Sequence, residues 1–393
     1  MSRILLTGGR APVTLELARL FTQAGHTVFV VESAPRHLCQ TSRAVYRSYR
    51  VPPPKQAPAA FVAALHQIIK QAQIDWLIPT CEEVFYVAQG RTQLTNMCHV
   101  LVDQLDKLRL FHNKWTFIQT AQQLGLPVPA TTLLTSPQDL TMLGSKVNDM
   151  VLKPAYSRFA TATRLPPHSH QTWQTLVPTP VAPWVAQTYL HGDHFCTYSV
   201  AHHGRLLAHA TYPVRWKAGQ GATMVFETFD HPQILAWVQM FVERTQFHGQ
   251  IAFDFIQPLG SEPLAIECNP RATSGVHLFS GDPRLVDALL GNATHLLTPA
   301  PGRPAMLALA MLLYGPTNLR STAQLRQWIE TLLRGRDVIF RRDDPRPWFA
   351  QFATLYQFWR WSVRSGVKLI AATTLDIEWN GEPLAELPTE TSE

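Results

Sequence analysis

The sequence predicts an α/β domain with a doubly wound parallel sheet, followed by an α+β region, and three observations lead to this prediction. Strand and helix patterns alternate as far as about residue 110, which is typical of a parallel sheet covered by helices. A breaker segment, Gly125 to Pro129, then separates the two parts. Short strand patterns dominate after it and few helices interrupt them, so this part does not continue the first sheet.

The elements of the first part follow from apolar runs and their boundaries. Residues 4–6 form a short apolar run that ends before Gly8 and Gly9, and Pro12 is a residue type favoured in the first turn of a helix. A second strand pattern follows Gly25. We expect strands over 4–6, 27–31, 74–78 and 98–102, and helices over 12–24, 59–71, after Thr80, and over 103–110 and 113–124.

The elements of the second part are mostly strands. We expect them over 150–153, 184–190, 195–201, 206–211, 251–256 and 264–269, with one long helix over 232–247. The predicted domains are 1–110, 111–300 with a small lobe over about 130–190 and a large lobe over about 190–300, and a C-terminal helical and aromatic extension over 301–393.

The charge and cysteine content exclude several classes of protein. The 393 residues carry 34 Lys and Arg against 28 Asp and Glu, a net charge of +6 that suits a protein handling anions. Zinc-finger spacing, RNA-binding aromatic motifs and lysine tracts are absent from the sequence, so we expect no nucleic-acid partner. The five cysteines form no Cys-x-x-Cys pair, which argues against structural zinc and a disulfide framework and favours the cytoplasm.

Apolar runs in the sequence are short. The first, over residues 4–6, is too short for the core of a signal peptide. The longest, Ala305 to Tyr314, has ten residues, whereas a helix needs about 20 to span a bilayer. We therefore expect a cytoplasmic protein without a transmembrane helix.

Two acidic strands carry the strongest chemical signal. Side chains alternate across a sheet, so Glu267 and Asn269 share one face of their strand. If this strand pairs with residues 251–256 through the connection 259–262, Asp254 lies opposite Glu267. Two facing carboxylates repel each other unless a cation lies between them, and magnesium prefers such oxygen ligands. A solvent-exposed hairpin would be equally consistent with the two acids alone, but Arg271 adds a phosphate-binding group beyond them.

The segments Asp254-Phe255 and Ile266 to Arg271 together resemble the metal-binding hairpin of ATP-grasp ligases, in particular the carbamoyl-phosphate-synthase-like branch. The order of motifs resembles stand-alone ligases of the mycosporine-glycine synthetase type. The resemblance covers about residues 1–290 and implies a Rossmann-like preATP-grasp domain followed by a two-lobed ATP-grasp fold. It also implies that Asp254, Glu267 and Asn269 bind one or two Mg²⁺ ions, with Mn²⁺ as a substitute, and that Arg271 contacts phosphate or an acyl-phosphate intermediate.

Further residues match positions that bind ATP in these ligases. Val151 to Pro154 resembles the strand whose lysine, here Lys153, reaches the α- and β-phosphates, and Lys114 matches an earlier lysine or arginine. The segment Trp184 to His194 resembles the hinge that binds adenine. The resemblance implies backbone contacts at Gln187, Thr188 and Leu190 and a ribose contact at His194, although Thr188 and His194 replace the usual glutamates.

Two loops remain open to interpretation. Residues 155–164 replace the glycine-rich phosphate loop of the family but contain no glycine, so Arg158 or Arg164 would have to supply charge there. Arg215 and Lys217 are candidates for a clamp on a carboxylate or phosphate, with a solvated basic turn as the alternative.

Two weaker patterns lie near the ends of the chain. Gly8, Gly9 and Glu32 superficially resemble a dinucleotide fingerprint but lack its full glycine spacing. Near the other end, six apolar side chains recur at helical spacing, with Arg360 and Arg364 beside them. We expect this helix to dock onto the catalytic body, with a membrane surface or partner protein as the alternative. The six residues are Trp348, Phe349, Phe352, Tyr356, Trp359 and Val363.

The sequence thus predicts an ATP- and Mg²⁺-dependent ligase that phosphorylates a carboxylate or enol-type oxygen and joins it to an amine or another nucleophile. Its expected partners are small-molecule carboxylate and amine substrates, and a homodimer is left open. Two alternatives remain: a non-catalytic ATP-binding or membrane-peripheral module, and an NAD-dependent epimerase or dehydrogenase.

Overall fold

The computed structural model describes residues 1–157, 162–168, 175–218, 222–385 and 387. Its first sheet is parallel and has the strand order β3-β2-β1-β4-β5. The strands are β1 (Arg3–Leu6), β2 (Thr27–Glu32), β3 (Arg47–Arg50), β4 (Trp76–Ile78) and β5 (His99–Val100), and the helices beside them are α1 (Pro12–Gln23), η1 (Leu38–Thr41), α2 (Pro58–Ala72), α3 (Val84–Gln89) and α4 (Arg91–Thr95). The predicted parallel sheet is confirmed.

Alternation along β1 places helices on both faces of this sheet. Ile4 and Leu6 pack in one buried cluster with Leu17 of α1, whereas Leu5 packs in another cluster with Phe61 of α2. The strand order reverses at β1, between β2 and β4. In such open sheets ligands bind beyond the carboxyl ends of the strands at this reversal.

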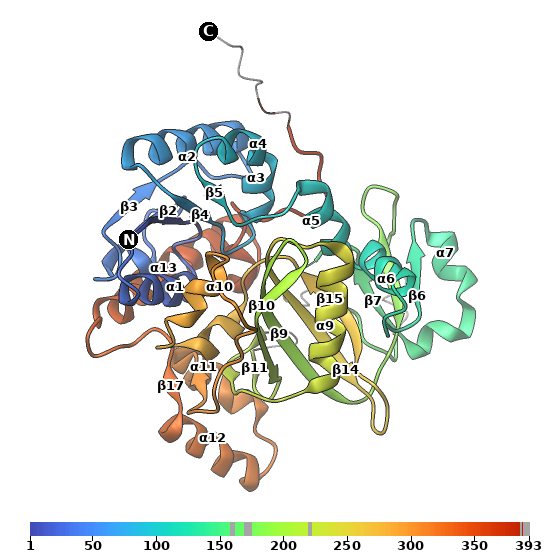
Figure 1. Ribbon diagram of the computed structural model, residues 1–393. Coiled ribbons are helices and arrows are strands. Elements are labelled where there is room, and N and C mark those ends of the chain that lie inside the picture. Colours follow the sequence, from blue (N-terminus) through green and yellow to red (C-terminus); the bar gives the residue numbers. More distant parts are fainter. Residues whose placement is uncertain (158–161, 169–174, 219–221, 386, 388–393) are drawn as a thin grey trace.

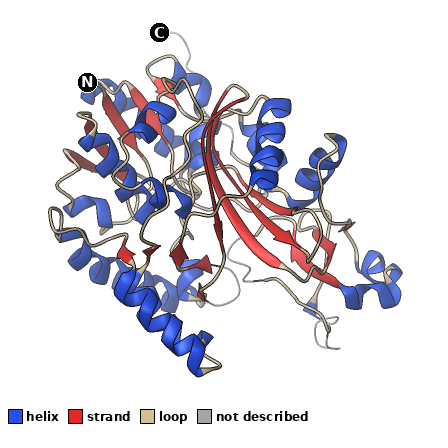
Figure 2. Cartoon of the chain, turned by 60° about the horizontal axis from the view of Figure 1, so that its bottom comes forward, coloured by secondary structure: helices blue, strands red, loops and turns tan. Residues whose placement is uncertain are grey.

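A second, antiparallel sheet occupies the middle of the molecule, and its long twisted strands stand out in Figure 2. Its order is β10-β9-β14-β15. Trp237 and Phe241 of the covering helix α9 contact Phe253, which fixes the buried face of β14. The elements are β9 (Asp193–His202), β10 (Arg205–Pro213), α9 (Pro232–Thr245), β14 (Gly249–Gln257) and β15 (Leu264–Asn269), followed by η3 (Ser274–Phe279) and α10 (Arg284–Leu289).

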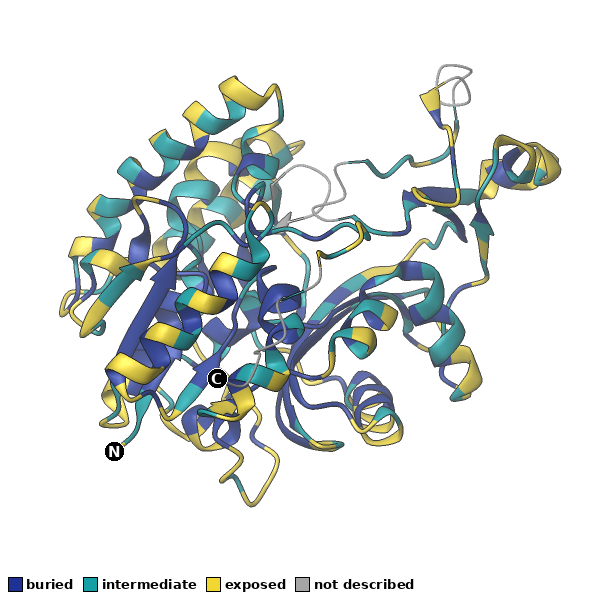
Figure 3. Ribbon diagram, turned by 90° about the horizontal axis from the view of Figure 1, so that it is seen from above, coloured by how far each residue is buried: buried dark blue, intermediate teal, exposed yellow. Residues whose placement is uncertain are grey.

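A third sheet, β6-β8-β7, forms a small antiparallel unit that lies at the right of Figure 1. It comprises β6 (Thr131–Leu134), β7 (Met150–Pro154) and β8 (Trp184–Thr188), with α7 (Pro137–Met142) and η2 (Gly144–Asp149). Helices α5 (Leu105–His112) and α6 (Lys114–Gln123) lead from the parallel sheet to this unit. The mixed α/β and α+β prediction is therefore confirmed. Figure 3 shows buried residues along the strands and exposed residues along the outer sides of the helices.

The C-terminal part returns to both large sheets. Short strands β11 (Lys217–Ala218) and β12 (Ala222–Thr223) pair with each other, and β13 (Val225–Phe226) pairs with β16 (Ala305–Met306), which also pairs with β17 (Arg336–Asp337). The last helices are α11 (Ala308–Tyr314), η4 (Gly315–Asn318), α12 (Thr322–Arg334), α13 (Arg346–Ser365) and α14 (Leu369–Ala372). None of the described helices is both long and apolar enough to cross a membrane.

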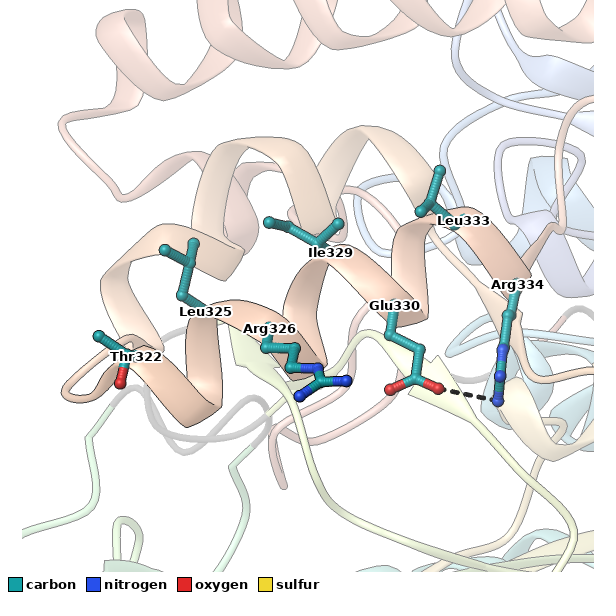
Figure 4. A pocket seen from close by; sticks show the side chains of 7 residues that line it. All are labelled: Thr322, Leu325, Arg326, Ile329, Glu330, Leu333 and Arg334. Atoms are coloured by element: carbon teal, nitrogen blue, oxygen red, sulfur yellow. Dashed lines mark ion pairs between the residues drawn. The ribbon is translucent and has the colours of Figure 1, made fainter.

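Helix α12 stands out because it has no buried residue. Leu325, Ile329 and Leu333 form a row along one side of it, and Arg326, Glu330 and Arg334 lie on another side (Figure 4). These side chains line a surface hollow of about 490 Å³ to which no other element contributes among the described residues.

The prediction that the aromatic stripe of α13 docks onto the body is wrong for five of its six residues. Only Trp348 is partly buried and packs against the core. Helix α13 instead docks through Pro347, Gln351, Thr354 and Phe358, which are its buried residues. Periodicity shows which side chains share a face, but it does not show which face meets the body. The exposed residues are Phe349, Phe352, Tyr356, Trp359 and Val363.

Candidate active site

Two carboxylates face each other at the centre of the molecule. Strands β14 and β15 pair so that Asp254 lies opposite Glu267 and Ala252 lies opposite Asn269, which confirms the predicted pairing. The neighbouring Phe253 points into the core beneath α9, so Asp254 points to the other face of the sheet. An irregularity in the ladder directly after Asp254 ends this regular alternation.

The two carboxylates repel each other electrostatically, and their chemistry suits a divalent cation. Burial and the charge of Glu267 raise the pKa of Asp254 from 3.8 to about 6. Among the described residues, no three His, Cys, Asp or Glu side chains group in a way that could hold a metal ion. Two carboxylates and the Asn269 amide nevertheless suit Mg²⁺, because this ion leaves most of its positions to phosphate and water.

Lys114 approaches the acidic pair from the start of α6. Asn113 caps this helix by accepting hydrogen bonds from the backbone N–H groups of Trp115 and Thr116, which fixes Lys114 in the first turn. Its Nζ lies 3.5 Å from Glu267 Oε1 and donates to the Ser157 carbonyl at 3.0 Å. The lysine is buried, so its charge acts in a weakly screened environment.

Lys153 lies near the same acids from the end of β7. Its Nζ donates to Gln187 Oε1 at 2.9 Å, and Gln187 Nε2 donates to Thr131 Oγ1 at 3.1 Å. Burial lowers the pKa of Lys153 to about 8, while the charges of Glu267 and Asp254 oppose this shift. Gln187 thus positions Lys153 through its side chain, whereas its backbone contact with ATP stays a prediction.

Arg271 bridges the hairpin and the parallel sheet. Its Nε donates to Glu82 Oε1 at 2.7 Å, and one Nη donates to Asn269 Oδ1 at 3.2 Å. Burial lowers the pKa of Arg271, but the charge and hydrogen bond of Glu82, together with Cys81 and Glu267, outweigh this effect and raise it. Glu82 lies beyond the carboxyl end of β4, at the reversal of the strand order, and was not predicted from the sequence.

Cys196 is a second residue that sequence reasoning missed. It lies opposite Asp254 on β9, on the side of β14 away from β15. Burial and the charge of Asp254 raise the pKa of its thiol, so it remains protonated and can hydrogen-bond the carboxylate. Only the register between β9 and β14 brings the two residues together, and the sequence does not specify that register.

The predicted adenine hinge lies at the end of β8. Thr188 donates its backbone N–H to the Ala130 carbonyl at 2.9 Å, and Tyr189 donates to the Asp149 carbonyl at 2.8 Å. These two N–H groups are therefore used within the protein and are not available to a ligand. Leu190 itself is half-buried.

His194 lies within electrostatic range of Lys217 and Lys153. Burial, followed by the charges of Lys217 and Lys153, lowers its pKa to about 4. The ring is therefore neutral near pH 7 and can accept or donate a hydrogen bond. Lys217 thus lies near His194. Arg215, in contrast, lies on an exposed part of the surface, where its Nη1 pairs with Glu227 Oε2 at 2.7 Å. The structure thus separates the two substrate candidates.

The glycine-free segment is described only in part. Arg158 lies outside the described residues. Arg164 exchanges backbone hydrogen bonds with Leu152 of β7, at 2.8 and 3.0 Å, so the segment returns to the strand that carries Lys153.

Side-chain atoms of the protein fill the space beside the glycine turn after β1. A Cβ added at Gly8 would lie 2.8 Å from Thr80 Oγ1 and 2.9 Å from Cys81 Sγ. Glu32, the residue that would bind a ribose in a dinucleotide site, accepts a 3.0 Å hydrogen bond from Arg10 Nε. Both observations argue against NAD at this turn.

Comparisons with known proteins support the overall architecture. No protein-family model matches the chain, and no curated protein sequence does. Solved structures match over most of its length. The N5-carboxyaminoimidazole synthetase of Staphylococcus aureus, complexed with ADP, has a TM-score of 0.62 at 13% identity over 80% of this chain and 85% of that one.

Two other matched structures belong to enzymes of other kinds. The biotin carboxylase domain of 2-oxoglutarate carboxylase from Hydrogenobacter thermophilus, a dimer with MgADP, has a TM-score of 0.60 at 10% identity over 77% of this chain and 73% of that one. An L-amino acid ligase from Bacillus licheniformis has 0.59 at 16% identity over 77% and 78%. The chain has the ATP-grasp fold. At these identities the likeness establishes the fold and leaves the reaction to the residues of the site.

Proposed function

We propose that this protein is an ATP- and Mg²⁺-dependent ligase that activates a carboxylate by phosphorylation and joins it to an amine, releasing ADP and phosphate. The observation that carries the proposal is the pair Asp254 and Glu267 on adjacent strands, with Lys114 3.5 Å from Glu267. Acids that repel each other beside buried lysines form a site for a cation and a polyphosphate together.

Each residue has a role that follows from its charge and position. Asp254 and Glu267, with Asn269, would hold Mg²⁺, which when bound neutralises phosphate charge. Lys153 and Lys114 bind phosphate oxygens, the backbone from Gln187 to Leu190 receives the adenine, and His194 approaches the ribose. Arg271, which donates to Asn269 Oδ1, stabilises the negative charge that develops on the transferred phosphoryl group.

The acceptor end of the site lies between the hairpin and the parallel sheet. Arg271 and Glu82 meet there, beyond the carboxyl end of β4. Phosphoryl transfer to the substrate carboxylate gives an acyl phosphate, and attack by the amine breaks its bond to phosphate. Catalysis by positioning and charge requires no side-chain nucleophile.

The finer predictions belong to this proposal. The matched structures include a synthetase and an L-amino acid ligase, which supports a reaction between a small acid and an amine. Activity of the mycosporine-glycine synthetase type, the cytoplasmic location and the division at residues 110 and 300 remain predictions. A homodimer is a further prediction, since one matched structure is a dimer.

The test is an ADP-release screen over amino acids and other small carboxylic acids, with Mg²⁺ and ATP. We expect acid- and amine-dependent ADP release by the wild-type protein and none by Glu267→Ala. Glu262→Ala, an exposed acid in the β14–β15 connection, is the matched control and should keep full activity. Unchanged turnover in Glu267→Ala would contradict the proposal. Mg²⁺-dependent ATP binding without turnover on any acid would favour a non-catalytic module instead.

A further inference from the structure

Helix α13 presents an aromatic face to solvent. Five large apolar side chains of α13 recur at spacings of three and four residues, and their exposed fractions lie between 46% and 65%. We call Phe349, Phe352, Tyr356, Trp359 and Val363 the aromatic face. Monomeric proteins seldom leave a continuous row of large apolar side chains uncovered, so this row indicates an interaction surface.

The opposite side of α13 holds the helix firmly on the body. Its buried residues include Gln351 and Phe358, and the helix packs against η1. The Arg10 guanidinium lies 5.5 Å from the centroid of the Phe358 ring. Gln357 Oε1 accepts a 3.1 Å hydrogen bond from the Arg36 backbone N–H. At 100° per residue the buried and aromatic faces are about 150° apart, so docking directs the aromatic face outward.

The charged side chains of α13 itself are all positive. Arg346, Arg360 and Arg364 of α13 are exposed and lie along one edge of the aromatic face, and Lys368 follows the helix. The sequence contains no Asp or Glu from Pro345 to Leu375. The partner that complements this surface is therefore anionic as well as apolar.

We propose that α13 docks the protein onto a membrane surface that contains anionic lipids, with the aromatic face in the headgroup region. Phe and Trp beside Arg form the pattern that lies in the plane of such an interface. Trp and Tyr favour this depth because one part of each ring system is apolar and another part is polar. The arginines flanking the face contact lipid phosphates.

A second copy of the chain fits this surface less well. Two α13 helices that paired through their aromatic faces in antiparallel fashion would bring Arg346 of one copy towards Arg360 and Arg364 of the other. No acidic residue of α13 could compensate for this repulsion. Insertion across the bilayer does not fit either, because no described helix is apolar enough to span it.

The experiment is cosedimentation of the full chain with lipid vesicles at about 0.1 M salt, where surface charges are only partly screened. We expect binding to phosphatidylcholine vesicles that contain about 30% phosphatidylglycerol and little binding to phosphatidylcholine alone. The triple variant Phe352→Ser, Tyr356→Ser, Trp359→Ser should bind at least about ten-fold more weakly. The variant Arg360→Gln, Arg364→Gln should lose about 10- to 30-fold, since each charge contributes about five-fold.

Matched controls separate a specific face from a general loss of surface. Met142→Ser, Leu259→Ser removes exposed apolar side chains elsewhere, and Lys70→Gln, Arg244→Gln removes exposed charges elsewhere. Both controls should sediment like the wild type. Absence of binding to anionic vesicles, equal binding to neutral vesicles or an unchanged triple variant would overturn the proposal. So would a wild-type dimer that dissociates in the triple variant without any vesicle binding, measured by analytical ultracentrifugation.

Discussion

Arg271 Nε lies 2.7 Å from Glu82 Oε1, although the two residues are 189 positions apart in the sequence. This ion pair connects the central antiparallel sheet with the parallel sheet. Arg271 follows β15, whereas Glu82 follows β4 of the parallel sheet. The pair is mostly buried, so each charge strongly affects the other. In the proposed ligase the pair would set where the arginine meets a phosphoryl group, and it would link the acceptor end of the site to the ATP end.

Glu82→Gln should therefore impair turnover more than ATP binding. The amide keeps the size of the side chain but removes the charge that holds Arg271, so we expect kcat to fall about ten-fold or more with little change in the KM for ATP. Steady-state ADP release measures both constants. Glu243→Gln, an exposed acid on α9, should leave them unchanged. A change confined to the KM for ATP would show that Glu82 serves nucleotide binding instead.

Asp254→Asn should stabilise the metal-free protein while abolishing its response to Mg²⁺. The folded-state pKa of Asp254 is raised to about 6, so its favourable contribution is present below about 4 and is lost as the pH rises through 6. The Asp254→Asn variant has no carboxyl group to ionise at this position. Its unfolding free energy should therefore exceed that of the wild type by an amount that grows between about pH 4 and 6 and reaches about 1–3 kcal/mol at pH 7. Denaturant unfolding at several pH values, with and without Mg²⁺, measures both effects. An advantage that does not depend on pH would contradict the assignment.

The charge of Lys153 predicts an alkaline limit to activity. Because burial lowers its pKa to about 8, kcat/KM for ATP should fall above that pH as the free protein loses the phosphate-binding charge. Gln187→Glu places a carboxylate where Gln187 Oε1 now accepts from Lys153 Nζ at 2.9 Å. That charge should raise the lysine pKa and move the limit to higher pH. A limit that stays in place in Gln187→Glu would assign it to another group.

The sequence predicted the hairpin well because its information is local. Alternation within β14 and β15 and a short connection determine that Asp254 faces Glu267, without knowledge of any other element. Glu82 and Cys196 could not be found in this way, since their contacts depend on how separate strands pack. A buried acid after a strand is a weak signal until the opposing arginine is known.

The errors in the predicted fold have equally specific causes. Strand β3 was missed because its sequence, Arg47 to Arg50, is polar and lies at the edge of the sheet, where no apolar pattern is required. The aromatic stripe of α13 was recognised correctly as one face but was assigned to the core. The face that docks contains Gln351 and Thr354. The periodicity of apolar residues alone does not suggest that these two polar residues are buried.

Asp376→Asn tests the contact that holds the C-terminal segment on the parallel sheet. Arg10 Nη1 lies 2.6 Å from Asp376 Oδ1, and Arg10 Nε donates to Glu32 at 3.0 Å. Breaking such a buried pair leaves part of the arginine charge uncompensated, so we expect a loss of about 2–4 kcal/mol in unfolding free energy. Glu330→Gln removes an exposed pair with Arg334 on α12 and should cost less than about 0.5 kcal/mol.

The same cluster predicts how this stability depends on pH. Burial raises the pKa of Glu32, but the charge and hydrogen bonds of Arg10, with smaller contributions from His37 and the Ala34 backbone, together outweigh it, and the pKa falls from 4.5 to about 2. The stabilisation by Glu32 is thus fully present above pH 4.5 and is lost as the pH falls through 2. Arg10→Met removes the cause of this depressed pKa, so its Glu32 should bind a proton at a higher pH than in the wild type. Urea unfolding from pH 2 to 7 should then show the variant losing stability at a higher pH than the wild type does. Parallel curves for the two proteins would mean that Arg10 does not control the ionisation of Glu32.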